Sequence, residues 1–209
     1  MSAFTVALDF SICLLWILTY ILVLVSTLKY KFPTISPITQ LIIAPFEFSS
    51  LYLFILQGSL SLDYAPVAYL FWSLIEIVIM IAIAKVGNYS AKTVTSYLIA
   101  LLVFTAIMIY LVAYRDNMLF FSYLNTLIGE VMWLIYVVKR DYPMKPLTAA
   151  LFTTKLIADI IAVPVYVGEG TIAVSVMCVM LPIVDLFFVG TYLEKSSQRN
   201  RKHGRGKLR

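Results

Sequence analysis

The chain has 209 residues, of which 62% are hydrophobic and 13% are charged, and its formal net charge is +5. Soluble domains are roughly half apolar and a quarter charged, so this composition excludes a water-soluble globular protein. Seven apolar stretches are each long enough to cross roughly 30 Å of hydrocarbon as a helix, and they leave no room for a separate soluble domain. We therefore expect an all-α, polytopic membrane protein.

The expected transmembrane helices follow one another through short connections. In chain order they cover residues 4–28, 36–58, 66–86, 94–114, 117–138, 147–167 and 171–193. Residues 1–193 would then form a single seven-helix domain, followed by a basic tail at 194–209. The first helix has no basic segment ahead of it and no small-residue cleavage motif, so we expect a retained helix rather than a signal peptide.

Lysine and arginine residues are concentrated in alternate connections. Fourteen of the sixteen cationic residues lie in the first, third and fifth connections and in the tail. Short cytoplasmic connections are enriched in these residues, so we expect the N-terminus outside and the C-terminus in the cytoplasm. The tail is then expected to rest on anionic lipid headgroups rather than on a nucleic acid. The sequence carries no signal for an oligomeric state.

Two parts of the chain share a pattern at an offset of 109 residues. A loop with basic, aromatic and proline residues precedes the second helix and again the sixth. The distance from Thr39 to Glu76 is 37 residues, and so is the distance from Thr148 to Asp185. This predicts a 3+1+3 architecture of two parallel repeats related by an axis along the membrane normal. The first repeat, the linker helix and the second repeat would span residues 4–86, 94–114 and 117–193.

Apart from Lys85, at the lysine-rich end of the third helix, seven ionisable side chains fall inside the expected helices, where each costs a few kcal/mol or more at the bilayer centre. They are Asp9, Glu47, Glu76, Glu130, Lys155, Asp159 and Asp185. At about 1.5 Å per residue, all except Asp9 fall in one layer about 12–18 Å from the cytoplasmic edge. Asp9 lies near the outer end of the first helix, where we expect it to be hydrated. Lys155 and Asp159 are four residues apart, which favours a structural ion pair and leaves a share in the site as the alternative.

The other four acids, at positions 47, 76, 130 and 185, share a medium of low dielectric constant. Desolvation and mutual repulsion disfavour their charged forms, so we expect at least one to be protonated near neutral pH. Such a group either donates a proton to a ligand or makes a hydrogen bond across helices. Aromatic rings, which stabilise cations, lie beside these acids or one helical turn away. They are Phe46, Phe48, Trp72, Trp133 and Phe188.

The surroundings of three of these acids resemble the motifs of a known family. The family is that of the small seven-helix membrane-bound terpene cyclases, which act in fungal meroterpenoid and indole-diterpene pathways and also have bacterial members. Residues 43–48 resemble its Asn-x-x-Trp-Glu-Phe-like segment on helix 2. Residues 72–76 resemble the family's Trp-x-x-x-Asp-like stretch, with a glutamate as the acid. Residues 184–188 resemble its apolar-Asp-apolar-aromatic segment on the last helix. The sequence departs from the family at Ile43 and Phe46, where asparagine and tryptophan are usual.

The resemblance implies an enzyme without metal or cofactor that protonates an epoxide or alkene of a lipophilic prenylated molecule and guides the carbocation into rings. Glu47 is then the proton donor, Asp185 its charged electrostatic partner and Glu76 a tuning residue. Glu47 and Asp185 are expected to line one pocket that opens toward the cytoplasmic half. Glu130 is expected to bind substrate together with the five aromatic residues.

Two other functions fit parts of the same pattern. A small-solute transporter of 3+1+3 architecture would use the buried acids for proton coupling. The Pro-Gln pair typical of such transporter repeats is absent from both proline-containing loops. The remaining alternative is a non-catalytic membrane subunit that binds a partner through its basic tail.

Overall fold

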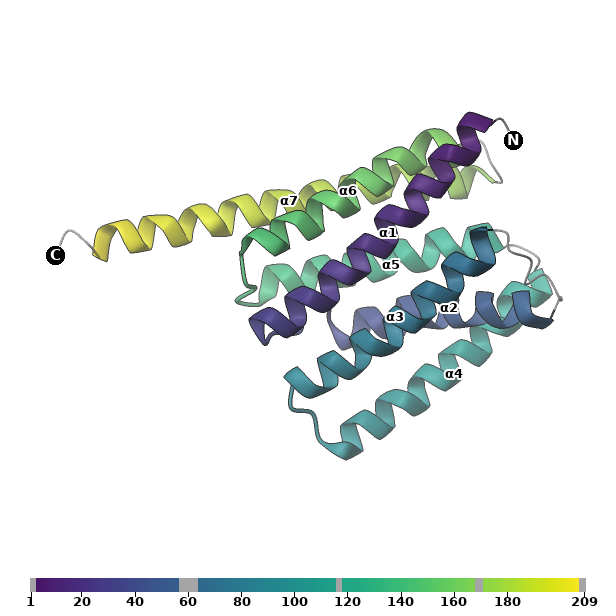
Figure 1. The fold of residues 1–209 in the computed structure, drawn as a ribbon, viewed down its shortest axis with the longest axis horizontal. Helices are drawn as coiled ribbons and strands as arrows, with labels where there is room; N and C mark the ends of the chain where they lie inside the picture. Colours follow the sequence, from purple (N-terminus) through teal and green to yellow (C-terminus); the bar gives the residue numbers. More distant parts are fainter. Residues whose placement is uncertain (1–2, 57–63, 116–117, 168–170, 207–209) are drawn as a thin grey trace.

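The computed structural model describes residues 3–56, 64–115, 118–167 and 171–206, and its regular elements there are all helices (Figure 1). All seven are long and apolar enough to cross a membrane. The prediction of an all-α fold with seven candidate membrane-spanning helices is therefore confirmed, and it indicates an integral membrane protein. In chain order the helices are α1 (Ala3–Tyr30), α2 (Pro37–Leu56), α3 (Tyr64–Val86), α4 (Ala91–Arg115), α5 (Met118–Lys139), α6 (Pro146–Tyr166) and α7 (Ile172–Gly206).

Serine caps explain where two of the helices begin. At α2 the backbone N–H of Thr39 donates to Ser36 Oγ at 3.0 Å, and proline occupies the first helical position. At α4 the backbone N–H of Thr93 donates to Ser90 Oγ at 3.2 Å. The start of α4 at Ala91 is three residues earlier than the apolar pattern predicts, because the cap holds a polar first turn in helical form.

The last helix is longer than expected, since α7 continues without a break beyond residue 193 and projects from the bundle (Figure 1). Residues 194–203 contain neither glycine nor proline and are rich in good helix formers. Gln198 Nε2 also donates to Glu194 Oε1 at 3.1 Å, one turn away. With 35 residues α7 is about 52 Å long, well beyond the roughly 30 Å of a hydrocarbon core.

Lys195 joins this extension to the end of α5. Its ammonium donates to three backbone carbonyls there, and a cation is favourable at a helix C-terminus. The acceptors are the oxygens of Val137, Val138 and Arg140, at 2.8, 2.9 and 2.7 Å. The predicted lipid contacts of the tail concern mainly the side chains from Arg199 onward, which lie outside the described residues.

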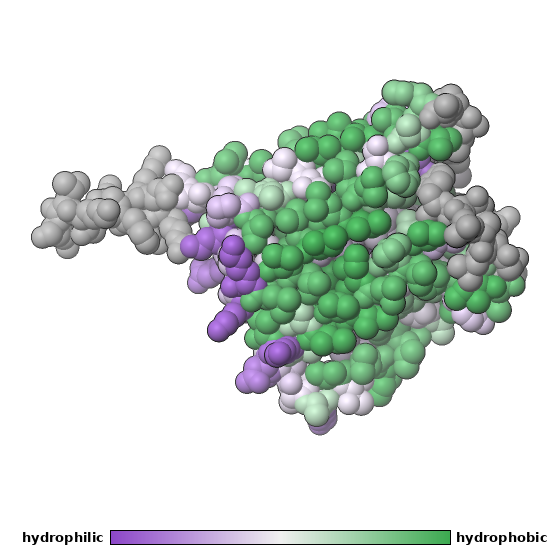
Figure 2. All heavy atoms as spheres, in the orientation of Figure 1, coloured by the Kyte–Doolittle hydropathy of each residue, from purple (hydrophilic) through white to green (hydrophobic). Residues whose placement is uncertain are grey.

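Helices α2 and α6 are the most buried of the seven spans. Helix α1 packs on α3 and α6, α2 packs on α3, α4 and α5, and α7 packs on α5 and α6. The main contact of α4 is with α2, and α4 is the least buried of the seven spans. Figure 2 shows hydrophobic residues over most of one face and hydrophilic ones gathered at the end where α7 leaves the bundle. We call this end the basic end, because the lysine-containing connections lie there.

The connections α1–α2 and α5–α6 contact each other at the basic end. The phenol of Tyr142 and the indole N–H of Trp133, the latter at 2.8 Å, donate to the carbonyl oxygen of Thr34. Tyr136 donates to the carbonyl oxygen of Pro33 at 2.8 Å. Burial raises the pKa of the Tyr142 phenol well above its usual value, so the group remains a protonated donor. The two loops that share the repeated sequence pattern are therefore held together.

Candidate functional site

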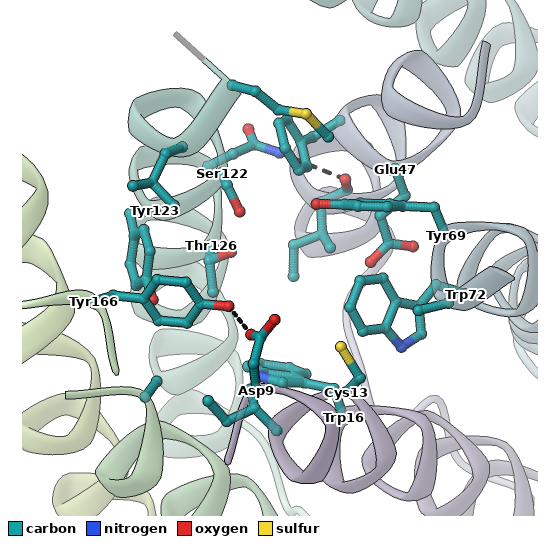
Figure 3. A pocket seen from close by; sticks show the side chains of 18 of the residues that line it. Asp9, Cys13, Trp16, Glu47, Tyr69, Trp72, Ser122, Tyr123, Thr126 and Tyr166 are labelled. Atoms are coloured by element: carbon teal, nitrogen blue, oxygen red, sulfur yellow. Dashed lines mark hydrogen bonds between the residues drawn. The ribbon is translucent and has the colours of Figure 1, made fainter. Parts of the chain in front are cut away.

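A cavity of about 380 Å³ lies between α1, α2, α3, α5 and α6 (Figure 3). This volume is within the range of small-molecule sites. Its lining includes Asp9, Phe54, Met118 and Tyr166, which come from the helix ends remote from the basic end. We expected the site to open toward the lysine-rich half, but this cavity reaches toward the opposite helix ends, and in the lysine-rich half Trp133, Phe152 and Phe188 pack against one another in the core.

Glu47 lines the cavity from α2 and is only 6% exposed. Tyr20 of α1 donates a hydrogen bond to Glu47 Oε1 at 2.5 Å. The second carboxyl oxygen, Oε2, has no hydrogen-bond partner among the described residues. No ion pair within the described part of the chain includes Glu47. The site therefore presents a carboxyl group to a largely apolar space, with its charge uncompensated by a cation.

Contacts between α2 and α5 hold the turn before Glu47 in place. Pro45 lacks an N–H and so interrupts the hydrogen-bond ladder of α2. Asn125 of α5 donates its side-chain amide to the carbonyl oxygens of Ile42 and Ile43. The close approach of α5 depends on Gly129, where a Cβ atom would lie 2.5 Å from Ile43 Cγ1. The backbone that carries Glu47 is thus tied to a neighbouring helix.

Glu76 lies behind Glu47 and does not line the cavity. It is fully buried, with Tyr20, Gln40 and Glu47 as its polar neighbours. Neither carboxyl oxygen of Glu76 has a hydrogen-bond partner among the described residues. We call the group formed by Tyr20, Gln40, Glu47 and Glu76 the acid cluster.

The other buried acids surround Lys155 on α6. Its ammonium lies 2.6 Å from Glu130 Oε1 and 3.3 Å from Asp159 Oδ2, and it also contacts Asp185. We call Glu130, Lys155, Asp159 and Asp185 the ion cluster. All four side chains are almost completely buried. The pairing of Lys155 with Asp159 is present, but it is one of three contacts that the lysine makes.

The charge of the ion cluster is unbalanced, since three carboxyl groups face one ammonium. Burying uncompensated charge in a membrane is costly, so the cluster is neutral only if two of the carboxyl groups hold protons. The carboxyl groups of Glu130, Asp159 and Asp185 lie within 4.8 Å of one another, a spacing that a metal ion would also accept. Lys155 contacts all three and supplies the positive charge that an ion would bring.

Glu47 lines this cavity, whereas Asp185, which we expected to line the same pocket, does not. Among the ion-cluster residues only Asp159 lines it, while Glu130 and Asp185 lie behind the wall. The indole of Trp16 belongs to that wall, and Lys155 Nζ lies 5.5 Å from its ring centroid. Lys155 thus contacts both this ring and Asp185.

The five aromatic residues expected to bind substrate divide between the cavity and the core. Phe46 and Trp72 line the cavity. Phe48 does not, because it is two residues after Phe46 and faces another side of α2. Trp133 and Phe188 do not line it either, since their rings pack against each other at 5.3 Å and against Phe152.

Several lining residues carry no clear signal in the sequence. Tyr69 of α3 packs edge-on against Trp72 at 5.0 Å and against Phe46 at 6.1 Å, and it completes an aromatic wall around Glu47 (Figure 3). On α1, successive lining residues are separated by three, one, three and four positions, which places them on one helix face. These are Asp9, Ile12, Cys13, Trp16 and Tyr20. That spacing was the available signal for the α1 face.

Asp9 was expected to be hydrated, but it is only 7% exposed and lines the cavity. Tyr166 of α6 donates a hydrogen bond to its Oδ1 atom. The packing of α6 across α1 covers the carboxyl group, which the sequence of α1 alone does not show.

Comparison of the chain with family models, with curated proteins and with solved structures finds no match. The function is therefore argued from the chemistry of the site.

Proposed function

We propose that this protein is a membrane-bound terpene cyclase that protonates an epoxide or alkene of a polyprenyl substrate and guides the resulting carbocation to a cyclic product. The observation that carries the proposal is Glu47, a buried carboxyl group that faces an apolar cavity and has one oxygen without a hydrogen-bond partner among the residues that the structure describes. A neutral carboxylic acid in such a place has a proton to give and no nearby cation to hold its charge. General acid catalysis needs this arrangement.

In the proposed reaction, protonated Glu47 donates its proton to the terminal epoxide oxygen or alkene carbon. Tyr20 stabilises the carboxylate that remains, through the hydrogen bond to Oε1. Glu76 tunes the donor from behind. The faces and edges of Phe46, Tyr69 and Trp72 surround the cationic intermediates. Water accepts a proton from carbon, which ends the reaction, and a proton returns from water to Glu47, so the product is an isomer of an alkene or epoxide substrate.

Asp185 enters this proposal as a positioning residue. It contacts Lys155, whose ammonium lies against the outer side of Trp16. The Lys155 ammonium is positioned behind this ring by the carboxyl groups that contact it, including that of Asp185. Asp185 thus acts on the cavity wall through Lys155 rather than on the substrate.

The test uses purified protein in lipid nanodiscs with a geranylgeranylated phenol and its terminal epoxide. Wild-type protein should form a product of unchanged mass and altered chromatographic retention. Glu47→Gln keeps the shape but removes the proton, so turnover should fall by about 10²–10⁴-fold. Glu194→Gln makes the same change at an exposed position of α7 and should retain wild-type turnover. Wild-type turnover in Glu47→Gln would reject the proposal.

We also propose that the N-terminus lies outside and the C-terminus in the cytoplasm. The gathering of hydrophilic residues at the basic end supports this orientation (Figure 2). In a background without the two native cysteines, an impermeant maleimide should label Thr171→Cys in intact cells and Ser197→Cys only after lysis. Both positions are exposed. The reverse pattern would invert the topology.

The 3+1+3 repeat is part of the same proposal. Under a two-fold exchange, α1, α2 and α3 change places with α5, α6 and α7. The contact α1/α3 then corresponds to α5/α7, the contact α2/α3 to α6/α7, and the contact α1/α6 to α5/α2, and all six contacts are present. Such an exchange is expected of two parallel repeats related by a two-fold axis. The exposure of α4 suits a linker.

This symmetry is also the observation that favours the second candidate, a small-solute transporter. In that case the buried acids would take up and release protons as the two repeats rock against each other. A pH gradient across proteoliposomes should then drive solute uptake that Glu47→Gln abolishes, and no cyclised product should form.

A further inference from the structure

We propose that Gln40 and Glu76 form, with bound water, a proton path that leads from the basic end to Glu47 without passing through the cavity. This inference rests on the proposed function and deepens it, because a donor that gives up its proton in each turnover must regain one. Neither Gln40 nor Glu76 lines the cavity. They would serve the donor from behind and would not touch the substrate.

Gln40 and Glu76 are completely buried, and their polar atoms are unsatisfied. Within the described ranges, the oxygen and nitrogen of the Gln40 amide and both oxygens of Glu76 have no hydrogen-bond partner, although the two side chains are neighbours. Buried polar groups left in this way are costly, and buried water is what usually completes them. The amide can both donate to and accept from water. Gln40 can therefore hold a water molecule beside the Glu76 carboxyl group.

Gln40 lies on the side of the acid cluster that is nearer the basic end. It is the fourth residue of α2, which begins at that end, and Glu47 follows seven residues later, or about 10 Å along the helix. Buried hydroxyl groups continue from Gln40 through the α1–α2 connection, and hydrogen bonds of 2.7 and 2.8 Å join two pairs of them. A polar interior of this kind accommodates water, whereas an apolar one stays dry. These hydroxyl groups belong to Ser26, Thr27, Thr34, Ser36 and Thr39.

Tyr20 connects Glu76 to Glu47. Its hydroxyl donates to Glu47 Oε1 at 2.5 Å and also lies beside the carboxyl group of Glu76. After Glu47 has protonated the substrate, Tyr20 passes its proton to the Glu47 carboxylate and takes one from Glu76. Glu76 then takes a proton from the water beside Gln40. One proton thus enters from the basic end for each proton that Glu47 gives up.

The cavity is the competing route for this proton, because Glu47 also faces it. The aromatic rings of Phe46, Tyr69 and Trp72 make the cavity apolar around the donor. A bound substrate or product would displace water from this space, and a carbocation needs a site without water. A path behind Glu47 supplies protons while the cavity stays dry.

Deuterium exchange at the Glu47 carboxyl group tests the path without turnover. The C=O stretching band of a protonated carboxyl group shifts on deuteration, and the Glu47 band is identified by its loss in Glu47→Gln. Infrared spectroscopy measures the rate of this shift after protein in lipid nanodiscs is transferred to heavy water. The measurement is repeated with farnesane, a saturated hydrocarbon, at a concentration that protects Cys13 in the cavity lining from N-ethylmaleimide.

In the wild-type protein, exchange at Glu47 should continue when farnesane fills the cavity. Gln40→Met keeps the volume but cannot hold water, and Glu76→Gln keeps the shape but cannot pass on a proton. Each should slow the exchange by about ten-fold or more. Ser50→Ala is the matched control, because Ser50 Oγ is also buried and without a partner in the described part of the chain, but it lies beyond Glu47 on α2, away from the basic end. It should leave the exchange rate unchanged.

The kinetics of product formation separate the path from a structural effect. In Gln40→Met, Glu47 begins with its proton, so the first product should form at the wild-type rate. Later turnovers should be slower by about ten-fold or more, because they wait for the returning proton. A change in the shape of the site would slow the first turnover as well.

Wild-type exchange that stops when farnesane is added would overturn the path, since the proton would then arrive through the cavity. A wild-type exchange rate in both Gln40→Met and Glu76→Gln would overturn it too. If no infrared band depended on Glu47, the donor would not be protonated, and both the path and the cyclase proposal would fall. Otherwise the exchange rates decide the path and the turnover of Glu47→Gln decides the cyclase proposal, so the two failures are distinguishable.

Discussion

The acid cluster and the ion cluster both contain buried carboxyl groups, but they differ in two respects. In the ion cluster a lysine contacts all three carboxyl groups, whereas the acid cluster has no cation among the described residues. The ion cluster lies almost wholly behind the cavity wall, and Glu47 of the acid cluster faces the cavity. We propose that the carboxyl groups with a counter-ion serve stability and that Glu47, without one among the described residues, transfers protons.

Removing the counter-ion should produce the largest change. Lys155→Met keeps much of the side-chain volume but leaves three carboxyl groups without a cation, so we expect a loss of about 3–5 kcal/mol in the free energy of unfolding. Unfolding in SDS-containing mixed micelles measures it. Lys92→Met, at an exposed site on α4, is the matched control and should change stability by less than about 0.5 kcal/mol. A Lys155 variant as stable as wild type would remove the structural role of the ion cluster.

Neutralising one acid in each cluster separates their roles. Asp185→Asn weakens a charged hydrogen bond to Lys155 and should cost about 1.5–3 kcal/mol of unfolding free energy. Glu47 makes no ion pair within the described ranges, so Glu47→Gln should cost less than about 1 kcal/mol of unfolding free energy while turnover collapses. Equal losses of stability in the two variants would contradict the distinction.

The helix contact behind Glu47 can be tested at Gly129. A methyl group there would meet Ile43, so Gly129→Ala should destabilise the protein by about 1–3 kcal/mol and reduce turnover by displacing α2. Gly190→Ala is the matched control, since a Cβ atom at that position has no neighbour within 4 Å. It should be neutral, or stabilising by up to about 1 kcal/mol. The same free energy of unfolding for both variants would show that α5 does not constrain α2 at this point.

The smallest effect is expected from the hydroxyl that joins Tyr20 to Glu47. Tyr20→Phe removes one hydrogen bond and should slow turnover by roughly ten-fold, equivalent to about 1.4 kcal/mol, with little loss of stability. Tyr52→Phe, at an exposed site on α2, should change neither quantity. Unchanged turnover in Tyr20→Phe would mean that the phenol does not act on the donor.

The sequence predicted the number of helices and most of their limits because apolar stretches of sufficient length are a direct signal for membrane helices. It did not predict the extended α7, since the polar residues after position 193 resemble a tail unless their helix propensity is considered. The first turn of α4 was missed for a related reason: its evidence was the cap at Ser90 and not hydrophobicity.

For the site, the sequence identified which residues are buried and ionisable but not which of them meet. The depth estimate placed six charges in one layer, and their separation into two clusters depends on the direction of each side chain around its helix. Lys155 illustrates the limit, because its spacing indicates Asp159 as a partner, whereas Glu130 and Asp185 come from other helices. The burial of Asp9 was not predicted because Tyr166, which packs over its carboxyl group, is 157 residues away in the sequence.

The placement of the three tryptophans gives the protein its own optical probes. Trp16 and Trp72 line the cavity, while Trp133 is packed in the core and donates its N–H to Thr34. A brominated lipophilic ligand in the cavity should quench the emission of the first two indoles and spare the third. Intrinsic fluorescence thus reports occupancy in unlabelled protein, and Trp133→Phe would remove the constant background.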